Sequence, residues 1–356
     1  MEIIIGKTAG FCFGVKNAVT KAEEALEQNE EIYCLGELVH NKQVTERLTQ
    51  KGMHFIDNIT EAKGKTVIRS HGVEKKTYKQ AENIKIDLID LTCPKVLHIH
   101  NIAEEYAKKG FYIILTGDEN HPEMLGTASF CGDHYYILED EENIEKAIDE
   151  FKKSKLNNVL LISQTTYSLE KFEKIAEKLQ KEIPSIEIIN TICNATKMRQ
   201  EETEQMAKDV DIMIIVGGKH SSNSNKLYEL AKKHCNNVLF VETADELNIK
   251  REFIGGKNHE NNPSVRIGIM AGASTPEESI RFTIKSIFCM VRRISRNIGV
   301  DMCITNQSRL FVWRNKLLFI HGIIFIIIDT QFLHNRIKRS NTLIKIIPIS
   351  GRRLTP

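Results

Sequence analysis

The sequence lacks the marks of a secreted or membrane-spanning protein. Its eight cysteines include no CxxC pair and are too sparse for a disulfide-stabilised scaffold. The apolar start Ile3–Ile5 is too short for a signal peptide and lacks a positively charged segment before it. The apolar run Leu317–Ile328 holds twelve residues, whereas a transmembrane helix needs about 20. We therefore expect a cytoplasmic protein whose thiols stay reduced.

Charge is divided unevenly along the chain. A length of 356 residues suggests two or three domains, and 41% hydrophobic with 27% charged residues is typical of a globular protein. The net charge is only +2. Residues 281–356 carry 14 Lys and Arg against two Asp, so this segment is +12 and residues 1–280 are −10. An acidic body thus precedes a basic tail.

Three cysteines each follow a short apolar segment and precede a helical pattern. Cys93 comes after the apolar run 84–91, and Pro94 suits the first turn of a helix. Cys12 and Cys193 stand in the same position between an apolar segment and a helical pattern. Open α/β sheets bind ligands at the carboxyl ends of their strands. Three related units would therefore point one thiol each at a common centre.

Strand and helix patterns alternate through the body, which favours parallel sheets covered by helices. Besides a strand before Cys12, we expect strands at 32–35, 67–72, 84–91, 112–117, 135–138, 159–163, 186–193, 212–218, 238–241 and 265–270. The clearest helical patterns lie at 15–28, 75–83, 97–109, 141–152, 169–181, 197–207 and 226–234. Because the repeat has no fixed period, we expect three related units and no solenoid.

The three strand-end thiols suit either of two metal centres. An iron–sulfur cluster held by three thiolates keeps one iron free for substrate, and a zinc ion held by three thiolates also keeps an open position. The spacing does not decide between them. The other cysteines are expected to be buried structural residues, namely Cys34, Cys131, Cys235, Cys289 and Cys303.

Three histidines, His40, His71 and His121, lie in turns after apolar segments and are expected to line the same pocket. Imidazolium groups and N–H donors suit an anionic ligand such as a phosphate. Glu123 would be a proton donor if burial raises its pKa, or else a helix-start carboxylate favoured by the helix dipole. Six histidines lack such a placement and are expected to be structural: His54, His98, His100, His134, His220 and His234.

A polar turn, Gly217–Asn225, joins an expected strand to an expected helix and is rich in hydroxyl and amide side chains. Backbone N–H groups at a helix N-terminus bind phosphate, although the order GxxxxGK[ST] of a Walker loop is absent. Gln164–Thr166 and Gly272–Ser274 have the same character. Together these turns predict a diphosphate-sized anion site beside a thiolate-bound metal.

Nine short motifs, in order, resemble those of the 4-hydroxy-3-methylbut-2-enyl diphosphate reductase family. Within about residues 1–285 they are Ala9–Cys12, Val39–Asn41, Ser70–Val73, Thr92–Pro94, His121–Glu123, Gln164–Thr166, Cys193–Thr196, Ser221–Asn225 and Ala271–Ser274. The resemblance implies an α/β trefoil of three pseudo-threefold-related domains, each with a small, mainly parallel sheet, around a central metal and substrate site. The domains would be residues 13–93, residues 94–193, and residues 1–12 plus 194–285.

The resemblance also implies a reaction. Two electrons and two protons would convert the allylic diphosphate to isopentenyl and dimethylallyl diphosphate and expel water, as the last step of the methylerythritol phosphate pathway. Cys12, Cys93 and Cys193 would hold a [4Fe–4S] cluster whose fourth iron takes the substrate's hydroxyl oxygen.

Roles for the other site residues are implied in the same way. Glu123 would supply a proton, with His121 beside it and Thr165 holding the substrate hydroxyl. The substrate would be bound by His40, His71, His121, Thr165, Ser221, Ser222, Asn223 and Ser274. Ferredoxin or flavodoxin would donate the electrons, and no nucleic acid or membrane partner is implied for the body.

Two segments depart from the family pattern. Residues 250–264 look like an expanded loop, and residues 286–356 form an atypical basic and apolar tail with the lone Trp313. For the tail we hypothesise a shifted reading frame or a degraded extension, with a membrane or nucleic-acid anchor as the alternative.

Two other functional classes stay open on the residues alone. One is a zinc-dependent hydrolase or lyase acting on a phosphorylated metabolite, which acid-labile sulfide would argue against. The other is a non-catalytic phosphosugar-binding regulator, which loss of activity with retained binding in Glu123→Gln would argue against.

Overall fold

The structure, a computed structural model, describes residues 2–28, 31–249, 265–297, 317–320 and 323–326. The chain divides into two compact units, residues 1–302 and residues 303–356. Three four-stranded sheets lie in the larger unit, and one two-stranded sheet lies in the smaller unit.

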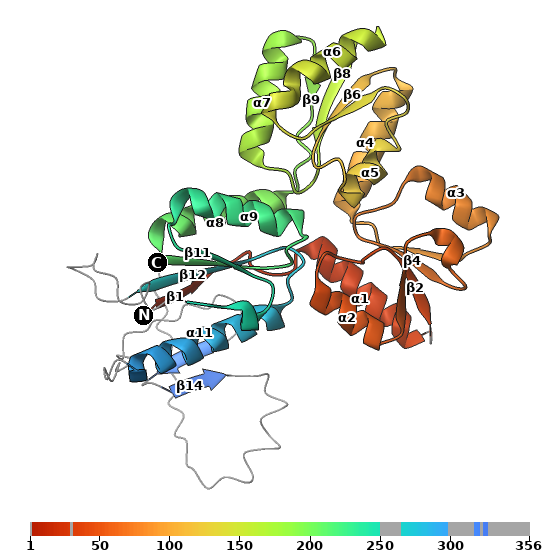
Figure 1. Ribbon diagram of the computed structural model, residues 1–356. Coiled ribbons are helices and arrows are strands. Elements are labelled where there is room, and N and C mark those ends of the chain that lie inside the picture. The colour runs from red at the N-terminus through yellow and green to blue at the C-terminus, as the bar shows by residue number, and fades with distance from the viewer. Residues whose placement is uncertain (1, 29–30, 250–264, 298–316, 321–322, 327–356) are drawn as a thin grey trace, which may run out of the picture. The chain divides into compact units, whose positions relative to one another are not determined.

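The three large sheets are entirely parallel and share one strand order (Figure 1). The first sheet runs β3 (Met53–Ile56), β2 (Ile32–Leu35), β4 (Thr66–Ile68), β5 (Leu88–Asp90). The second runs β7 (Tyr135–Leu138), β6 (Tyr112–Thr116), β8 (Val159–Ser163), β9 (Glu187–Ile188). The third runs β11 (Val238–Val241), β10 (Ile212–Val216), β12 (Arg266–Ala271), β1 (Glu2–Ile5). This repetition confirms the predicted α/β class with three similar domains.

The edge strand at the end of each of these orders leads to one of the predicted cysteines. β5 is followed by Cys93 and α4 (Pro94–Lys108), and β9 by Cys193 and α8 (Asn194–Asp209). In the third sheet this place is taken by β1, the first strand of the chain, which is followed by Cys12 and α1 (Phe13–Gln28). The third domain therefore joins the N-terminal strand to strands from beyond residue 210, while the exact domain boundaries stay a prediction.

Two of these edge strands are shorter than the sequence predicted. The run 84–91 begins with the end of α3 (Lys75–Asn83), because Lys85 has a φ of +58° and the Ile86 N–H bonds the Ala81 carbonyl. Only Leu88–Asp90 then joins the sheet.

The expected strand 186–193 is shortened for a different reason. The Thr191 hydroxyl donates to the Ser163 carbonyl at 2.5 Å and accepts from the Ser163 N–H at 2.7 Å. A side chain thus replaces the strand ladder beyond Ile188.

Helices cover both faces of the sheets, as the second domain illustrates. β6 and β8 are buried along their whole length. Ile113 and Leu160 pack into one apolar cluster, while Ile114 and Leu161 pack into another on the opposite face. Continuous apolar strands of this kind are typical of a parallel sheet that is covered on both sides.

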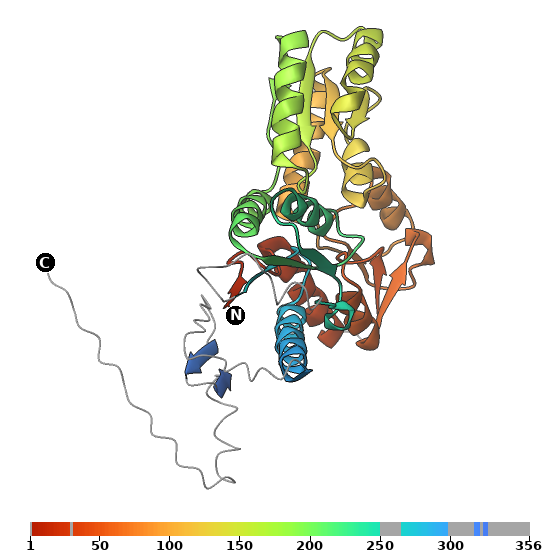
Figure 2. The same cartoon turned by 60° about the vertical axis from the view of Figure 1, so that its left-hand side comes forward.

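The remaining helices connect these strands. They are α2 (Lys42–Gln50), α5 (Pro122–Ala128), α6 (Ile144–Ser154), α7 (Leu169–Glu182), α9 (Ser222–His234) and α11 (Glu277–Asn297), with single 3₁₀ turns at Ile59–Glu61, Glu141–Asn143 and Ala244–Glu246. In the third domain α8 and α9 lie on one side of the sheet and α11 on the other (Figure 2). Three expected helices begin three or four residues before their predicted apolar patterns, at Pro94, Asn194 and Ser222. Pro94 stands in the first turn, as expected, and the Ser221 side chain caps the third of these helices by accepting the Ser224 N–H. Cys93 and Cys193 make no side-chain cap hydrogen bond. The short edge strand β3 was not predicted.

The C-terminal region differs from the expectation of a tail starting at residue 286, because α11 continues to Asn297. Within the apolar run, β13 (Leu317–Ile320) and β14 (Ile323–Ile326) pair antiparallel in the smaller unit. No helix among the described residues is long and apolar enough to cross a membrane. The expanded loop expected at 250–264 and Cys303 lie outside the described residues.

Candidate active site

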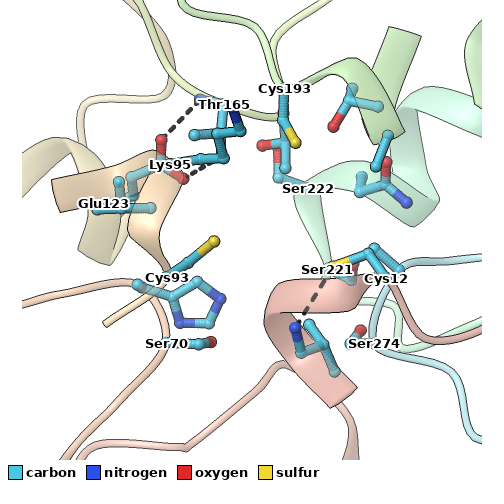
Figure 3. A pocket seen from close by; sticks show the side chains of 18 of the residues that line it. Cys12, Ser70, Cys93, Lys95, Glu123, Thr165, Cys193, Ser221, Ser222 and Ser274 are labelled. Atoms are coloured by element: carbon cyan, nitrogen blue, oxygen red, sulfur yellow. Dashed lines mark hydrogen bonds between the residues drawn. The ribbon is translucent and has the colours of Figure 1, made fainter. Parts of the chain in front are cut away.

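A pocket lies where the carboxyl ends of the strands of the three large sheets meet (Figure 3). Its empty space is about 710 Å³, including open solvent at its mouth. It is lined by Cys12, Val15, His40, Ser70, His71, Cys93, Lys95, Val96, His121, Glu123, Thr165, Thr166, Cys193, Ala195, Thr196, Arg199, Ser221, Ser222, Asn223, Ala273 and Ser274. Every site residue predicted from the sequence is among them. The parallel sheets explain why these predicted residues come together. The turns that carry them follow the carboxyl ends of strands, and these ends lie at the same edge of each sheet.

The three cysteines enter the pocket at the start of three helices, and their sulfur atoms face its middle (Figure 3). Cys93 and Cys193 are the N-cap residues of α4 and α8, and the Val15 N–H of α1 points to the Cys12 Sγ at 3.4 Å. Helix N-termini carry partial positive charge, which favours thiolates. Burial raises the pKa of the Cys93 thiol, and the neighbouring Cys12 and Cys193 contribute in the same direction.

Gly14 leaves room between two of these sulfurs. A Cβ on this residue would lie 2.6 Å from the Cys93 Sγ and 4.0 Å from the Cys12 Sγ. Real Cβ atoms do not approach a neighbour to 2.6 Å. A residue without a side chain is therefore needed beside Cys93.

The donor set fits a multi-iron group. The three thiols are spread around one pocket, an arrangement in which each thiolate would bind a different iron of a cluster.

Arg199 is a buried cation of this pocket that the sequence analysis missed. Its Nη2 donates to the Gly10 carbonyl at 2.6 Å and its Nη1 to the Ala195 carbonyl at 3.2 Å. Burial lowers its pKa, while the nearby Cys12 and Cys193 thiols oppose that effect. A buried guanidinium beside thiols compensates negative charge there. No signal in the sequence separates this residue from the exposed charges of α8.

Glu123 and Thr165 form a buried pair between α5 and the turn after β8 (Figure 3). The Thr165 N–H donates to Oε1 and the Thr165 hydroxyl to Oε2, each at 2.6 Å. Burial raises the pKa of Glu123 to about 7, and the two Thr165 donors oppose the rise. The sequence predicted Glu123 to be a proton donor if burial raises its pKa, and burial does raise it. A carboxyl group with such a pKa can give a proton near neutral pH.

His40, His71 and His121 come together as a cluster of three rings. The rings of His40 and His71 stack with their centroids 4.2 Å apart, and His121 presents an edge to both at 5.2 and 5.5 Å. Burial lowers the pKa of His71 and lowers that of His121 to about 3, with the other imidazoles contributing. Both shifts favour the neutral ring, which offers one N–H donor and one acceptor nitrogen.

Several buried polar atoms of the pocket have no hydrogen-bond partner among the described residues. They are Nε2 of His40, Nδ1 of His71 and both amide atoms of Asn223. A buried polar group without a partner costs about 1–3 kcal/mol. Their common position in one pocket indicates a polar ligand that satisfies them together.

The N-terminus of α9 adds backbone and hydroxyl donors to the same side of the pocket. Ser221 caps the helix by accepting the Ser224 N–H at 3.3 Å, which leaves the hydroxyl proton of Ser221 free to donate. Thr166 donates to the Ser222 hydroxyl at 3.3 Å. Ser274 donates to the His40 carbonyl at 3.0 Å, which ties the third domain to the first. A helix N-terminus with these hydroxyl groups is suited to bind phosphate.

Residues predicted to be structural have mixed outcomes. Cys34, Cys131 and Cys235 are buried as expected, whereas Cys289 is exposed on α11, so that prediction was wrong. Cys289 lies on a helix whose other side packs on the sheet, and its sequence pattern did not show which face it occupies. His100 is buried and stacks on Phe130 at 4.4 Å, outside the pocket.

Comparisons with known proteins place this geometry in a family. A sequence model of the LytB protein family matches residues 3–288. The 4-hydroxy-3-methylbut-2-enyl diphosphate reductase of Caldanaerobacter subterraneus subsp. tengcongensis is 41% identical over 293 residues, which are 81% of this chain and 96% of that relative. The family match ends at residue 288, inside α11.

Two solved structures are also similar. One, of (E)-4-hydroxy-3-methyl-but-2-enyl diphosphate reductase, the terminal enzyme of the non-mevalonate pathway, is 36% identical with a TM-score of 0.58 and covers 81% of this chain and 99% of its own. The other, the E-1-hydroxy-2-methyl-but-2-enyl-4-diphosphate reductase from Plasmodium falciparum, is 28% identical with a TM-score of 0.71 and covers 80% and 87%.

Proposed function

Because the chain belongs to the LytB protein family, we propose that it reduces 4-hydroxy-3-methylbut-2-enyl diphosphate to isopentenyl and dimethylallyl diphosphate. This is the last step of the methylerythritol phosphate, or non-mevalonate, pathway. The protein is an oxidoreductase that consumes two electrons and two protons for each water that leaves. The observation that carries the proposal is one pocket that combines three thiols, a buried acid and an anion-binding helix end.

Cys12, Cys93 and Cys193 would hold a [4Fe–4S] cluster in this pocket. Three thiols at helix N-termini, a buried Arg199 and the open space at Gly14 all fit an anionic multi-iron group. Such a cluster, when bound, supplies single electrons and a Lewis-acidic iron with an open coordination position. The remaining chemistry belongs to the side chains.

The diphosphate binds between the histidine cluster and the start of α9. The unpartnered atoms of His40, His71 and Asn223 donate or accept there, and the hydroxyls of Ser221 and Ser222 donate. His121, Thr165 and Ser274 complete the set that surrounds the substrate. The backbone N–H groups and the helix dipole at the start of α9 add to the attraction for the anion.

Glu123 gives the proton that the leaving hydroxyl requires. Because its pKa is raised, the Glu123 carboxyl group is protonated in a fraction of the protein molecules at neutral pH. Thr165 fixes both carboxyl oxygens in one orientation. The Thr165 hydroxyl also lines the pocket, where it holds the substrate hydroxyl within reach of this carboxyl group. General acid catalysis of this kind contributes about 10²–10⁴ in rate.

Ferredoxin or flavodoxin supplies the electrons in the cytoplasm. This assignment follows from the family and from a reaction that takes electrons one at a time.

The experiment that tests the function is turnover of 4-hydroxy-3-methylbut-2-enyl diphosphate by anaerobically purified protein with dithionite-reduced methyl viologen. We expect both isomeric products, and equal amounts of iron and acid-labile sulfide in the protein. A protein that retains iron and sulfide but does not turn over this substrate would overturn the proposal. Zinc without sulfide would support the hydrolase in its place.

A further inference from the structure

The helices that begin at the three cysteines present an exposed surface that the proposed reaction does not use. We define the cysteine rim as Phe13, Lys16, Lys95, Leu97, Lys197 and Met198. Each lies one to five residues after Cys12, Cys93 or Cys193, within the first turns of α1, α4 and α8. All six are exposed.

The rim is apolar in a way that is unusual for a surface. Phe13 is 81% exposed, Met198 48% and Leu97 36%, and they are three of the seven large hydrophobic residues that are exposed in the described part of the chain. Each of the three cysteine helices contributes one of them. Because the three domains repeat one strand, cysteine and helix order around a single pocket, the first turns of these three helices surround that pocket.

The charge of the rim is opposite to that of the body. None of the three helices has an acidic residue in its first turn. Lys16 and Lys95 form no ion pair with the described residues, and Lys197 reaches Glu201 only at 4.0 Å. Residues 1–280 carry a net charge of −10, so this cluster of three lysines at three helix N-termini is a local positive site.

We propose that the cysteine rim is the docking surface for a small acidic protein that carries single electrons. The proposal rests on the proposed function, in which two electrons and two protons remove the hydroxyl group as water. Two molecules of the reduced carrier are each oxidised by one electron in that balance. The rim is the part of the exposed surface that follows the three thiols most closely along the chain, so it offers a short path to a group bound by them.

The size and composition of the rim fit such a partner. Electron-transfer complexes are transient and bury less than about 1,200 Å². Three exposed apolar residues and three lysines suit that size, because apolar contacts exclude water while the charges steer the encounter. A second copy of this chain fits less well, since it would bring the lysines of two rims against one another.

The test uses the full-length holoenzyme and a bacterial [4Fe–4S] ferredoxin as the donor. In the variant Lys16→Glu/Lys197→Glu, we expect the ferredoxin concentration for half-maximal turnover to rise roughly tenfold at low salt, with a weaker salt dependence. Turnover with reduced methyl viologen should stay unchanged, because this small donor needs no docking surface.

A matched variant, Lys79→Glu/Lys152→Glu, makes the same change of charge on α3 and α6. Both lysines are exposed and have no ion pair among the described residues. We expect its ferredoxin dependence to equal that of the unaltered protein. If both double variants weaken ferredoxin equally, the effect is one of net charge, and the rim is not the docking surface.

A second rim variant, Met198→Glu, tests the apolar part of the surface and should also weaken ferredoxin while sparing viologen turnover. Direct binding of oxidised ferredoxin, measured by sedimentation, gives a readout that does not depend on catalysis. Equal binding to the unaltered protein and to both rim variants would overturn the proposal. Sedimentation that shows two copies of the chain held together through the rim would overturn it as well. If viologen-driven turnover is absent in the unaltered protein, the proposed function fails, whereas the docking surface is still judged by this binding measurement.

Discussion

Thr165 holds the Glu123 carboxyl group with two hydrogen bonds, one from its N–H and one from its hydroxyl, both 2.6 Å long. The two residues are 42 positions apart in the chain. Glu123 lies in the first turn of α5, which follows β6, and Thr165 lies in the turn after the adjacent strand β8. Both residues are buried, and they line the same pocket as the three cysteines. The two hydrogen bonds therefore fix the orientation of a carboxylic acid inside this pocket.

Glu123→Gln is therefore expected to abolish most turnover while leaving binding intact. Glutamine keeps the size of the side chain. Its single oxygen can accept the Thr165 N–H and its NH2 group can donate to the Thr165 hydroxyl, but it has no acidic proton. We expect kcat to fall by roughly 10²–10⁴, with the dissociation constant of the diphosphate substrate changed by less than about threefold. Single-turnover kinetics and calorimetric binding measure the two effects separately.

Thr165→Val is the companion variant, because it removes the hydroxyl donor but leaves the N–H donor in place. It should lower kcat less than Glu123→Gln does. Full activity in Glu123→Gln would show that another group provides the proton.

The pH dependence of turnover follows from the same carboxyl group. Burial raises the pKa of Glu123 to about 7 from the usual value near 4.5. The acid form is needed, so kcat should be constant at low pH and fall as pH rises through about 7. In Glu123→Gln this descending limb should disappear from the residual rate.

Stability should change in the same pH window. The folded protein holds the Glu123 proton more tightly than the unfolded chain, so between about pH 4.5 and 7 the unfolded state binds fewer protons and stability decreases as pH rises. Thermal unfolding of the unaltered protein and of Glu123→Gln across this range measures the contribution. Identical pH profiles for the two proteins would contradict it.

Gly14→Ala tests the space beside the thiols. A Cβ at this position would lie 2.6 Å from the Cys93 Sγ, so the sulfur has to move. We expect the variant to fold but to retain less than about half of the iron and sulfide, because displacing a ligand group weakens metal binding by about tenfold or more. Gly64→Ala is the control, since a Cβ there meets only the Tyr33 ring at 3.9 Å. Equal iron content in the two variants would show that the cysteine site tolerates the added methyl group.

The sequence predicted the residues of this pocket well because each follows a strand. Cys93, His71 and Ser221 stand in turns, where their polar side chains contrast with the apolar strands before them. Arg199 could not be found in this way, because it lies inside α8 among charged residues that face solvent. Only the fold shows that its guanidinium reaches the Gly10 carbonyl.

Element boundaries were harder to predict for a related reason. An apolar run predicts a strand, but the ends of a strand depend on contacts with distant residues. The Thr191 hydroxyl takes the place of a strand hydrogen bond at Ser163, and nothing near Thr191 in the sequence indicates this contact. The lowered pKa of His121 likewise depends on burial and on the nearby charges of His40, Arg69 and Lys226, which lie far from it in the sequence.

Removal of residues 298–356 tests whether the tail belongs to the functional protein. The family match ends at residue 288, whereas α11 continues to Asn297, so a chain that stops there keeps the whole described helix. We expect residues 1–297 to match the full-length protein in iron content and viologen-driven turnover. Its melting temperature should differ by less than about 3 °C, because the truncation removes no described core contacts.

A shorter chain that stops at residue 276 lacks α11, whose Ile280, Ile284 and Ile287 are buried, and should unfold or aggregate. Loss of iron or activity in the 1–297 chain would show that the tail is a working part of the protein and would argue against a shifted reading frame.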